Sequence, residues 1–190
     1  MLSLSDNEFS VISFLVRNFT ERLTIRSIAQ RLSFSPAGVF NILKKLEKSN
    51  IVVGQKLGTG LFYAINFENR IAEHLAAVVL LYSEEKISMD SETRENQRFS
   101  VPKKSEGFFR ELKQARAAVF DKKTLLLVVD NITILDISIP NIEVITKTED
   151  ELIELLRKKD STMLQLLKKG TALFGEDKII SIIKQCISRF

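Results

Sequence analysis

Apolar residues recur at helical spacing in three short segments near the start of the chain. Asp6 and Thr24 are residue types that cap helices, so they predict the starts of the first two segments. Ser35 is a suitable cap for the third helix, and Pro36 fits its first position, where no backbone N–H is needed. In this third helix, apolar positions at i, i+3, i+4 and i+7 predict one buried stripe. The members of the stripe are Val39, Ile42, Leu43 and Leu46.

The other face of the third helix is predicted to be polar and basic, without a bulky apolar group. Its members are Ala37, Asn41, Lys44, Lys45 and Lys48. An asparagine side chain can pair with the edge of adenine, and a lysine can bind guanine or a phosphate. This face therefore suits insertion into the major groove of DNA.

Two apolar runs after the third helix predict a β-hairpin. The runs cover residues 51–57 and 61–67, and Gly58-Thr59-Gly60 separates them. A short connection with two glycines between apolar runs is typical of a hairpin turn. Lys56 and Thr59 lie near the tip, where they can contact the DNA backbone.

Residues 6–67 resemble the winged-helix family of transcription regulators, in its archaeal type. The resemblance rests on the order helix, helix, turn, helix and ribbon, and on the pattern S-x-x-x-V-x-x-x-L-x-x-L-E-x-x-x-I-V that begins at Ser35. A strand containing Tyr63 completes the ribbon. The resemblance implies DNA binding, with Ser35 positioning the start of the recognition helix. Arg26 lies in the first turn of the second helix. It either contacts a DNA phosphate or is an ordinary solvent-exposed arginine. A helix and hairpin used only for protein contacts is the alternative.

The distribution of charge agrees with DNA binding. Residues 1–67 hold eight Lys and Arg against four Asp and Glu, whereas the rest of the chain holds 20 of each sign. The net charge of +4 therefore lies entirely in the first segment. Because this excess is modest, we expect salt-sensitive binding rather than indiscriminate coating of DNA.

Residues 68–83 predict a further helix that connects the first domain to the rest of the chain. One side of it is apolar, with Ile71, Leu75, Val78, Val79 and Tyr82. Leu80 and Leu81 make this stripe wider than one small domain needs to cover. The width favours a homodimer, which would place two recognition helices on neighbouring half-sites. Packing of the helix against the first domain is the alternative.

Residues 84–107 are polar, carry charges of both signs and show no period, as is typical of a linker. A second domain is expected over residues 108–190. Its pattern predicts a helix from Phe108 to Val119, strands at 124–129, 132–139 and 142–146, helices starting near Thr148 and Asp160, a short apolar run at 172–174 and a closing helix at 176–188. The expected fold class is α+β, with a winged helix over residues 1–67, a connecting helix and a small α/β domain.

The second domain is similar to small nucleotidyltransferase domains over about residues 117–188. The segments that carry the resemblance are TLLLVVD, IEVITKTEDELIELL and LLKKGTALFGEDKIISII. Active members use a Gly-Ser turn for the triphosphate, and an Asp-x-Asp pair with a third acid for magnesium. Here the Gly-Ser turn is missing, Lys123 and Leu125 occupy the positions of the pair, and Glu143 alone matches the third acid. The resemblance therefore implies a degenerate, inactive relative.

No other candidate chemistry stands out in the sequence. Asp121, Asp130 and Asp136 are scattered around strand ends, and one His with one Cys argues against zinc. We therefore expect no catalytic residue, no metal and no cofactor. The single Cys186 fits a reducing cytosol. Since no apolar run approaches a membrane span and the N-terminus lacks a signal-peptide pattern, we expect a cytoplasmic protein without a membrane partner.

These patterns predict a sequence-specific regulator that binds double-stranded DNA. Its second domain would serve assembly, sensing or the binding of a protein partner. Two rival functions stay open. One is a nucleotidyltransferase with a displaced metal site, which Mg²⁺-dependent transfer from a labelled nucleoside triphosphate would support. The other is a protein-interaction module, as in a toxin–antitoxin pair, which an absence of DNA binding would favour.

Overall fold

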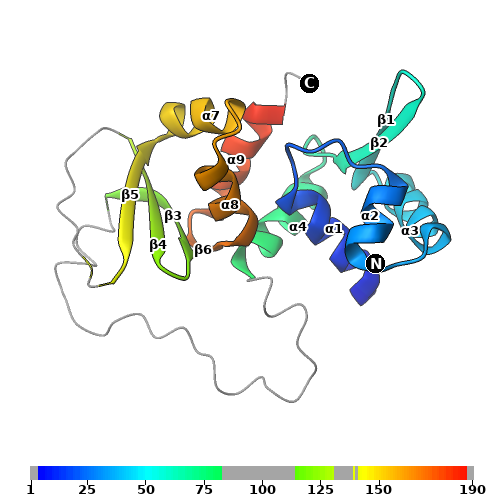
Figure 1. Cartoon of the computed structure of the whole chain (residues 1–190), viewed down its shortest axis with the longest axis horizontal. Helices are drawn as coiled ribbons and strands as arrows, with labels where there is room; N and C mark the ends of the chain where they lie inside the picture. The colour runs from blue at the N-terminus through cyan, green and yellow to red at the C-terminus, as the bar shows by residue number, and fades with distance from the viewer. Residues whose placement is uncertain (1–3, 83–113, 131–138, 140, 188–190) are drawn as a thin grey trace, which may run out of the picture. The chain divides into compact units, whose positions relative to one another are not determined.

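The chain divides into two compact units, Met1–Val79 with Ile183–Phe190, and Leu80–Ile182. The computed structural model describes residues 4–82, 114–130, 139 and 141–187 (Figure 1). The elements of the N-terminal unit are α1 (Asp6–Arg17), α2 (Ile25–Leu32), α3 (Pro36–Lys48), β1 (Val52–Leu57), β2 (Gly60–Ile65) and most of α4 (Arg70–Leu81). Three helices followed by an antiparallel hairpin are the winged-helix order, which confirms the prediction for this part of the chain.

Side-chain caps fix the starts of the three helices. The Thr24 and Ser35 hydroxyls accept backbone N–H groups at the starts of α2 and α3, as predicted. The prediction for α1 was wrong by one residue, because Ser5 and not Asp6 is the cap. Ser5 forms a reciprocal capping box with Glu8, which satisfies two backbone N–H groups that Asp6 alone could not satisfy.

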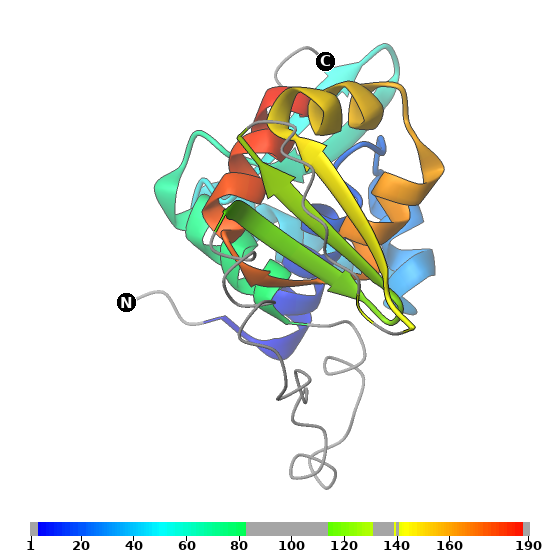
Figure 2. The same ribbon diagram turned by 90° about the vertical axis from the view of Figure 1, so that its left-hand side faces the viewer.

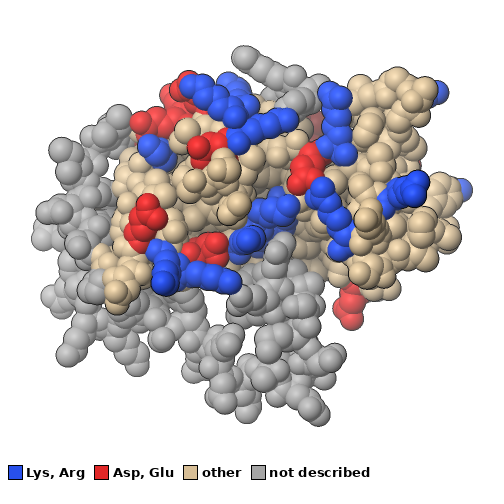
Figure 3. Space-filling view, in the orientation of Figure 1, with Lys and Arg blue, Asp and Glu red and all other residues tan. Residues whose placement is uncertain are grey.

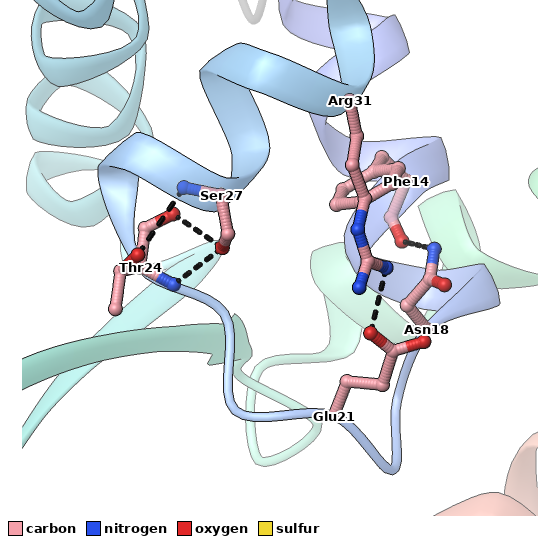
Figure 4. Close-up of polar contacts among 6 residues, drawn as sticks. All are labelled: Phe14, Asn18, Glu21, Thr24, Ser27 and Arg31. Atoms are coloured by element: carbon pink, nitrogen blue, oxygen red, sulfur yellow. Dashed lines mark hydrogen bonds and ion pairs between the residues drawn. The ribbon is translucent and has the colours of Figure 1, made fainter.

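The α1–α2 connection ties the helices to the hairpin. The Tyr63 backbone N–H donates to the Leu23 carbonyl oxygen at 2.8 Å, so this connection forms an isolated antiparallel bridge with β2. Arg31 forms an ion pair with Glu21 at 2.6 Å, and its guanidinium lies 5.7 Å from the centre of the Phe14 ring (Figure 4). These contacts hold α2, and therefore the start of α3, in a defined position relative to the hairpin.

The connecting helix α4 is shorter than the predicted range 68–83. Its N-terminal turn is fixed by Asn69, whose side-chain oxygen accepts the Ile71 N–H at 2.8 Å. Ser83 lies outside the described residues. Val79 and Leu80 are buried, so the prediction that they belong to the same stripe as Ile71 was wrong. The helix instead buries one side and exposes apolar residues on another.

The C-terminal unit is built on a mixed four-stranded sheet with helices packed on it. Its elements are β3 (Ala115–Asp121), β4 (Thr124–Val129), β5 (Glu143–Thr148), α7 (Glu149–Arg157), α8 (Ser161–Lys169), β6 (Thr171–Phe174) and most of α9 (Glu176–Ile187). The strand order is β5-β4-β3-β6, in which β4 and β5 are parallel and the other neighbours antiparallel (Figure 2). All five residues from Leu125 to Val129 are buried, as the continuous apolar run predicted. Together the two units make an α+β protein, as expected.

The prediction for residues 108–119 was wrong where the structure describes them. Residues 115–119 belong to strand β3 and not to a helix, whereas 108–113 lie outside the described residues. Alanine-rich segments fit a helix locally, but β3 pairs with β4 on one side and β6 on the other. These tertiary hydrogen bonds override the local preference. Of the strand expected at 132–139, only Ile139 is described, and it forms an isolated bridge with Ile142.

Candidate nucleic-acid interface

The recognition helix α3 separates a buried side from a polar exposed side. Val39, Leu43 and Leu46 are buried, and Ile42 is half-buried, so the predicted stripe is confirmed with one member at its margin. Four of the predicted DNA-contact residues share the exposed side. These are Ala37, Asn41, Lys44 and Lys48. The Ser35 hydroxyl accepts the Gly38 N–H at 3.0 Å, which supports its predicted role in positioning the helix start.

The exposed side of α3 also carries a bulky apolar residue, contrary to the prediction. Phe40 is 46% exposed. The Lys44 ammonium lies 5.9 Å from the centre of the Phe40 ring, a distance typical of a cation–π contact. The stripe analysis missed Phe40 because four other apolar residues already account for the buried side. Exposure of an aromatic residue at the centre of a candidate interface could be found only from the structure.

Lys45 lies at the edge of α3 and pairs with the first helix. Its ammonium is 2.5 Å from the Glu8 carboxylate, which is nearly buried and also accepts the Ser5 N–H at 2.8 Å. The hydrogen bond and charge of Lys45, with the Ser5 N–H, hold the pKa of Glu8 below its ordinary value. Lys45 thus fixes α3 against α1, a role that the sequence did not indicate. Its predicted DNA contact stays a prediction.

This pair predicts an acid-sensitive contribution to stability. A lowered carboxyl pKa means that the folded state favours the charged Glu8, so the stabilisation is present above about pH 4.5 and is lost as pH falls through the folded pKa. We expect Glu8→Ala to lower the free energy of unfolding at pH 7 by about 1–2 kcal/mol through loss of the capping box and the ion pair. Urea titrations at pH 7 and pH 3.5 measure this difference.

The loss caused by Glu8→Ala should be smaller at pH 3.5. The Glu8 carboxyl is then mostly protonated in the unfolded state, so folding into the charged form must release this proton. Asp6→Ala is the matched control, since it removes a neighbouring carboxylate that is exposed and does not cap α1. Equal losses at the two pH values for Glu8→Ala would contradict the role of the ion pair.

The wing turns one face toward the helices. In β1 and β2 the buried residues Val52, Tyr63 and Ile65 lie on the same face of the hairpin, and the alternation of strands puts Lys56 on this face as well. The Gly54 N–H donates to the Glu47 carboxylate at 3.3 Å, which joins the end of α3 to β1. Lys56 is exposed beyond this junction, and Thr59 lies in the turn at the tip.

Three of the eight Lys and Arg side chains in residues 1–67 form ion pairs or hydrogen bonds within the N-terminal unit. Arg31 pairs with Glu21, and Lys45 forms the ion pair described above. Arg17 is buried and donates to the Val79 carbonyl oxygen at 2.8 Å. The other five are exposed, and no ion pair joins any of them to an acidic residue in the described part of the chain. They are Arg22, Arg26, Lys44, Lys48 and Lys56. Four of these are predicted DNA-contact residues, whereas Arg22 was not predicted.

Several basic residues of the C-terminal unit lie beside acidic ones. Around α7, Lys and Arg side chains alternate with Asp and Glu on the face drawn in Figure 3. Arg116 pairs with Asp130 at 2.6 Å, and Lys158 with Glu154 at 2.6 Å. The net positive charge of the chain comes from residues 1–67, where the predicted DNA contacts lie.

The sheet lacks a cluster of metal ligands in the part that the structure describes. Lys123 lies in the β3–β4 turn, and Leu125 is buried in β4. Glu143 is opposite Thr124 in the neighbouring strand β5. Within residues 4–82, 114–130, 139 and 141–187, no three His, Cys, Asp or Glu side chains are grouped to hold a metal ion.

Comparisons with known proteins bear on the N-terminal unit. Residues 4–53, which cover α1 to α3 and the start of the wing, match a family model described as winged helix-turn-helix DNA-binding. A search of curated proteins gave no match. No helix among the described residues has the length and apolar character of a membrane span. The fold, the exposed basic residues and the family match agree that the N-terminal unit is a winged helix-turn-helix DNA-binding domain.

Proposed function

We propose that the protein is a cytoplasmic transcription regulator that recognises a specific sequence in double-stranded DNA. The observation that carries this proposal is the surface of α3 and the wing. Asn41 and Lys44 lie exposed on the recognition helix, and Lys56 lies exposed on strand β1 of the hairpin. Amide and ammonium groups on one helix face match the polar edges of bases and the phosphates beside them.

Arg26 is proposed to contact a phosphate at the start of α2. The first turn of a helix presents unpaired backbone N–H groups and the positive end of the helix dipole, both of which favour an anion. Arg26 adds a mobile positive charge at this place, and its side chain is exposed. Contacts of this kind set the register of the protein on the duplex and leave base reading to α3.

A homodimer is proposed, with α4 at its interface. Ile71 is 50% exposed and Val78 39% exposed, and both lie on one face of the helix with the half-buried Leu75 between them. Ala72 and Ala76 on the other side are fully buried. A helix that exposes an apolar stripe opposite its buried side is typical of an association surface. Two copies would place their recognition helices on half-sites about one helical turn of DNA apart.

The dimer predicts that a charge within the stripe separates the subunits. Val78→Glu is expected to raise the dimer dissociation constant at least tenfold, because an unpaired carboxylate would be buried at the interface. Sedimentation equilibrium measures the change. Leu57→Glu is the matched control, since it places the same charge on an apolar residue of the wing that is 45% exposed, against 39% for Val78. A dissociation constant that Val78→Glu leaves unchanged would remove α4 from the interface.

The C-terminal unit is proposed to be a non-catalytic relative of nucleotidyltransferases that serves assembly, sensing or a protein partner. Support comes from the buried Leu125 and the lysine at position 123, which stand where magnesium ligands would be needed. A lysine ammonium repels Mg²⁺, and the single carboxylate of Glu143 cannot organise two metal ions.

Selection from genomic DNA tests the proposed function. The full chain is incubated with genomic fragments, which include the promoter region of its own gene, and the bound fragments are sequenced. We expect a small set of fragments to be enriched and to share a motif with two-fold symmetry. Retention of all fragments in equal proportion would contradict sequence-specific recognition.

A further inference from the structure

The exposed ring of Phe40 lies within the candidate DNA-contact surface. A single exposed apolar residue is common and indicates nothing by itself. The position of Phe40 is informative because it follows Ala37 by one helical turn, precedes Lys44 by one turn and adjoins Asn41. All three neighbours are exposed residues of the predicted contact face. A base edge that reaches Lys44 therefore also lies within reach of the ring.

The core does not need Phe40. Val39, Leu43 and Leu46 supply the buried side of α3, and each is almost completely inaccessible to solvent. The ring is instead held on the outside of the helix, where the Lys44 ammonium lies 5.9 Å from its centre. This contact leaves part of the ring open and joins it to a charged group that binds guanine or phosphate.

The chemistry of the major groove restricts what such a ring can contact. Guanine, cytosine and adenine present hydrogen-bonding groups and small C–H groups there, whereas thymine alone presents a methyl group, at C5. A phenyl ring cannot replace the water bound to an amino or carbonyl group, so covering a polar edge is unfavourable. Packing on a methyl group is favourable because both surfaces are apolar. The methyl group of Ala37, one turn away, extends the apolar surface.

We propose that Phe40 selects DNA sites with thymine at one position of each half-site, by packing its ring on the C5-methyl group. This inference rests on the proposed DNA-binding function and adds a specificity-determining residue to it. Asn41 and Lys44 read the polar edges of neighbouring bases, and Phe40 reads the apolar one.

Deoxyuridine substitution tests the contact. The full chain first selects its tightest-binding duplex from a randomised pool, and each thymine in the protected region is then replaced in turn by deoxyuridine. This replacement removes one methyl group and keeps every hydrogen-bonding group of the base. At the contacted position, the wild-type protein is expected to lose about fourfold in affinity, the effect of one methyl group in an apolar contact. Phe40→Ala is expected to bind the thymine duplex and the deoxyuridine duplex with equal affinity.

Leu57→Ala is the matched control. Leu57 is 45% exposed, close to the value for Phe40, but it lies on the face of the wing opposite to Lys56. This variant should keep the fourfold preference for thymine. If Phe40→Ala keeps the same preference as the wild type, the ring does not read thymine, although DNA binding itself stands. If the wild type selects no duplex from the pool, the proposed function fails, and the role of Phe40 fails with it.

Discussion

Replacing Gly175 with alanine is expected to destabilise the C-terminal unit by about 3–5 kcal/mol. Gly175 joins β6 to α9 with φ of +69°, a conformation that side chains with a Cβ rarely adopt. An added Cβ would lie 2.2 Å from the Arg116 carbonyl oxygen and 2.7 Å from the Ala117 Cα. Both atoms belong to the backbone of β3, which β4 and β6 hold on its two sides. The strand cannot yield without losing its pairing.

Urea titration followed by circular dichroism, with hydrogen exchange of the β3 amides, measures this loss. Gly58→Ala is the matched control, because Gly58 also has positive φ, at +59°, but no atom lies within 4 Å of the added Cβ. Its cost is limited to backbone strain of about 1 kcal/mol. Similar losses for the two variants would contradict the steric explanation, and an unchanged Gly175→Ala midpoint would contradict the packing of β3 against this turn.

Removing one positive charge from α3 and one from the wing is expected to weaken DNA binding by about 30- to 100-fold at 0.1 M salt. Lys44 and Lys56 are the two residues, and both are exposed without an acidic partner in the described part of the chain. Each phosphate contact releases counterions and contributes about 0.9 to the slope of log affinity against log salt. The double variant Lys44→Ala, Lys56→Ala should therefore lower the slope by about 2.

The control variant removes two positive charges from the C-terminal unit. Lys159 and Lys169 are exposed there, and Lys159→Ala with Lys169→Ala changes the net charge by the same amount. This variant should keep the wild-type slope, because the excess charge near the DNA is unchanged. Equal effects of the two double variants would mean that net charge alone, and not the α3 and wing surface, determines binding.

Lys45 differs from the other basic residues of α3 because it forms an ion pair with another helix. Although it is adjacent to Lys44, it pairs with Glu8, a residue 37 positions earlier in the chain. Helical periodicity places Lys45 near the polar face but cannot supply a partner on another helix. The exposure of Phe40 could not be predicted for a similar reason, because helical spacing assigns this residue to neither the buried nor the polar side of α3. Local patterns predicted the helix, its cap and its buried side, whereas pairing between helices depended on the tertiary fold.

The wing and the C-terminal sheet also differ in how well their strands could be predicted from the sequence. Two apolar runs with a glycine turn were enough to predict β1 and β2, since a hairpin is formed by neighbouring residues. Strand β3 was mistaken for a helix because its alanine-rich sequence does not show the alternation of a strand. It forms a hairpin with β4 through the Lys122-Lys123 turn, and it also pairs with β6, where Ala118 lies opposite Phe174, 56 positions later. An alanine-rich segment favours a helix by itself, and pairing within the sheet overrides this preference.

The most direct test of the central claim is the affinity of the full chain for one selected fragment at two salt concentrations, measured beside a scrambled fragment of equal length. Recognition by α3 and the wing predicts tight binding to the selected fragment at both salt concentrations, with lower affinity at higher salt. It also predicts that the scrambled fragment binds at least 100-fold more weakly. Equal affinity for the two fragments, or no binding to either at low salt, would contradict a sequence-specific DNA-binding function.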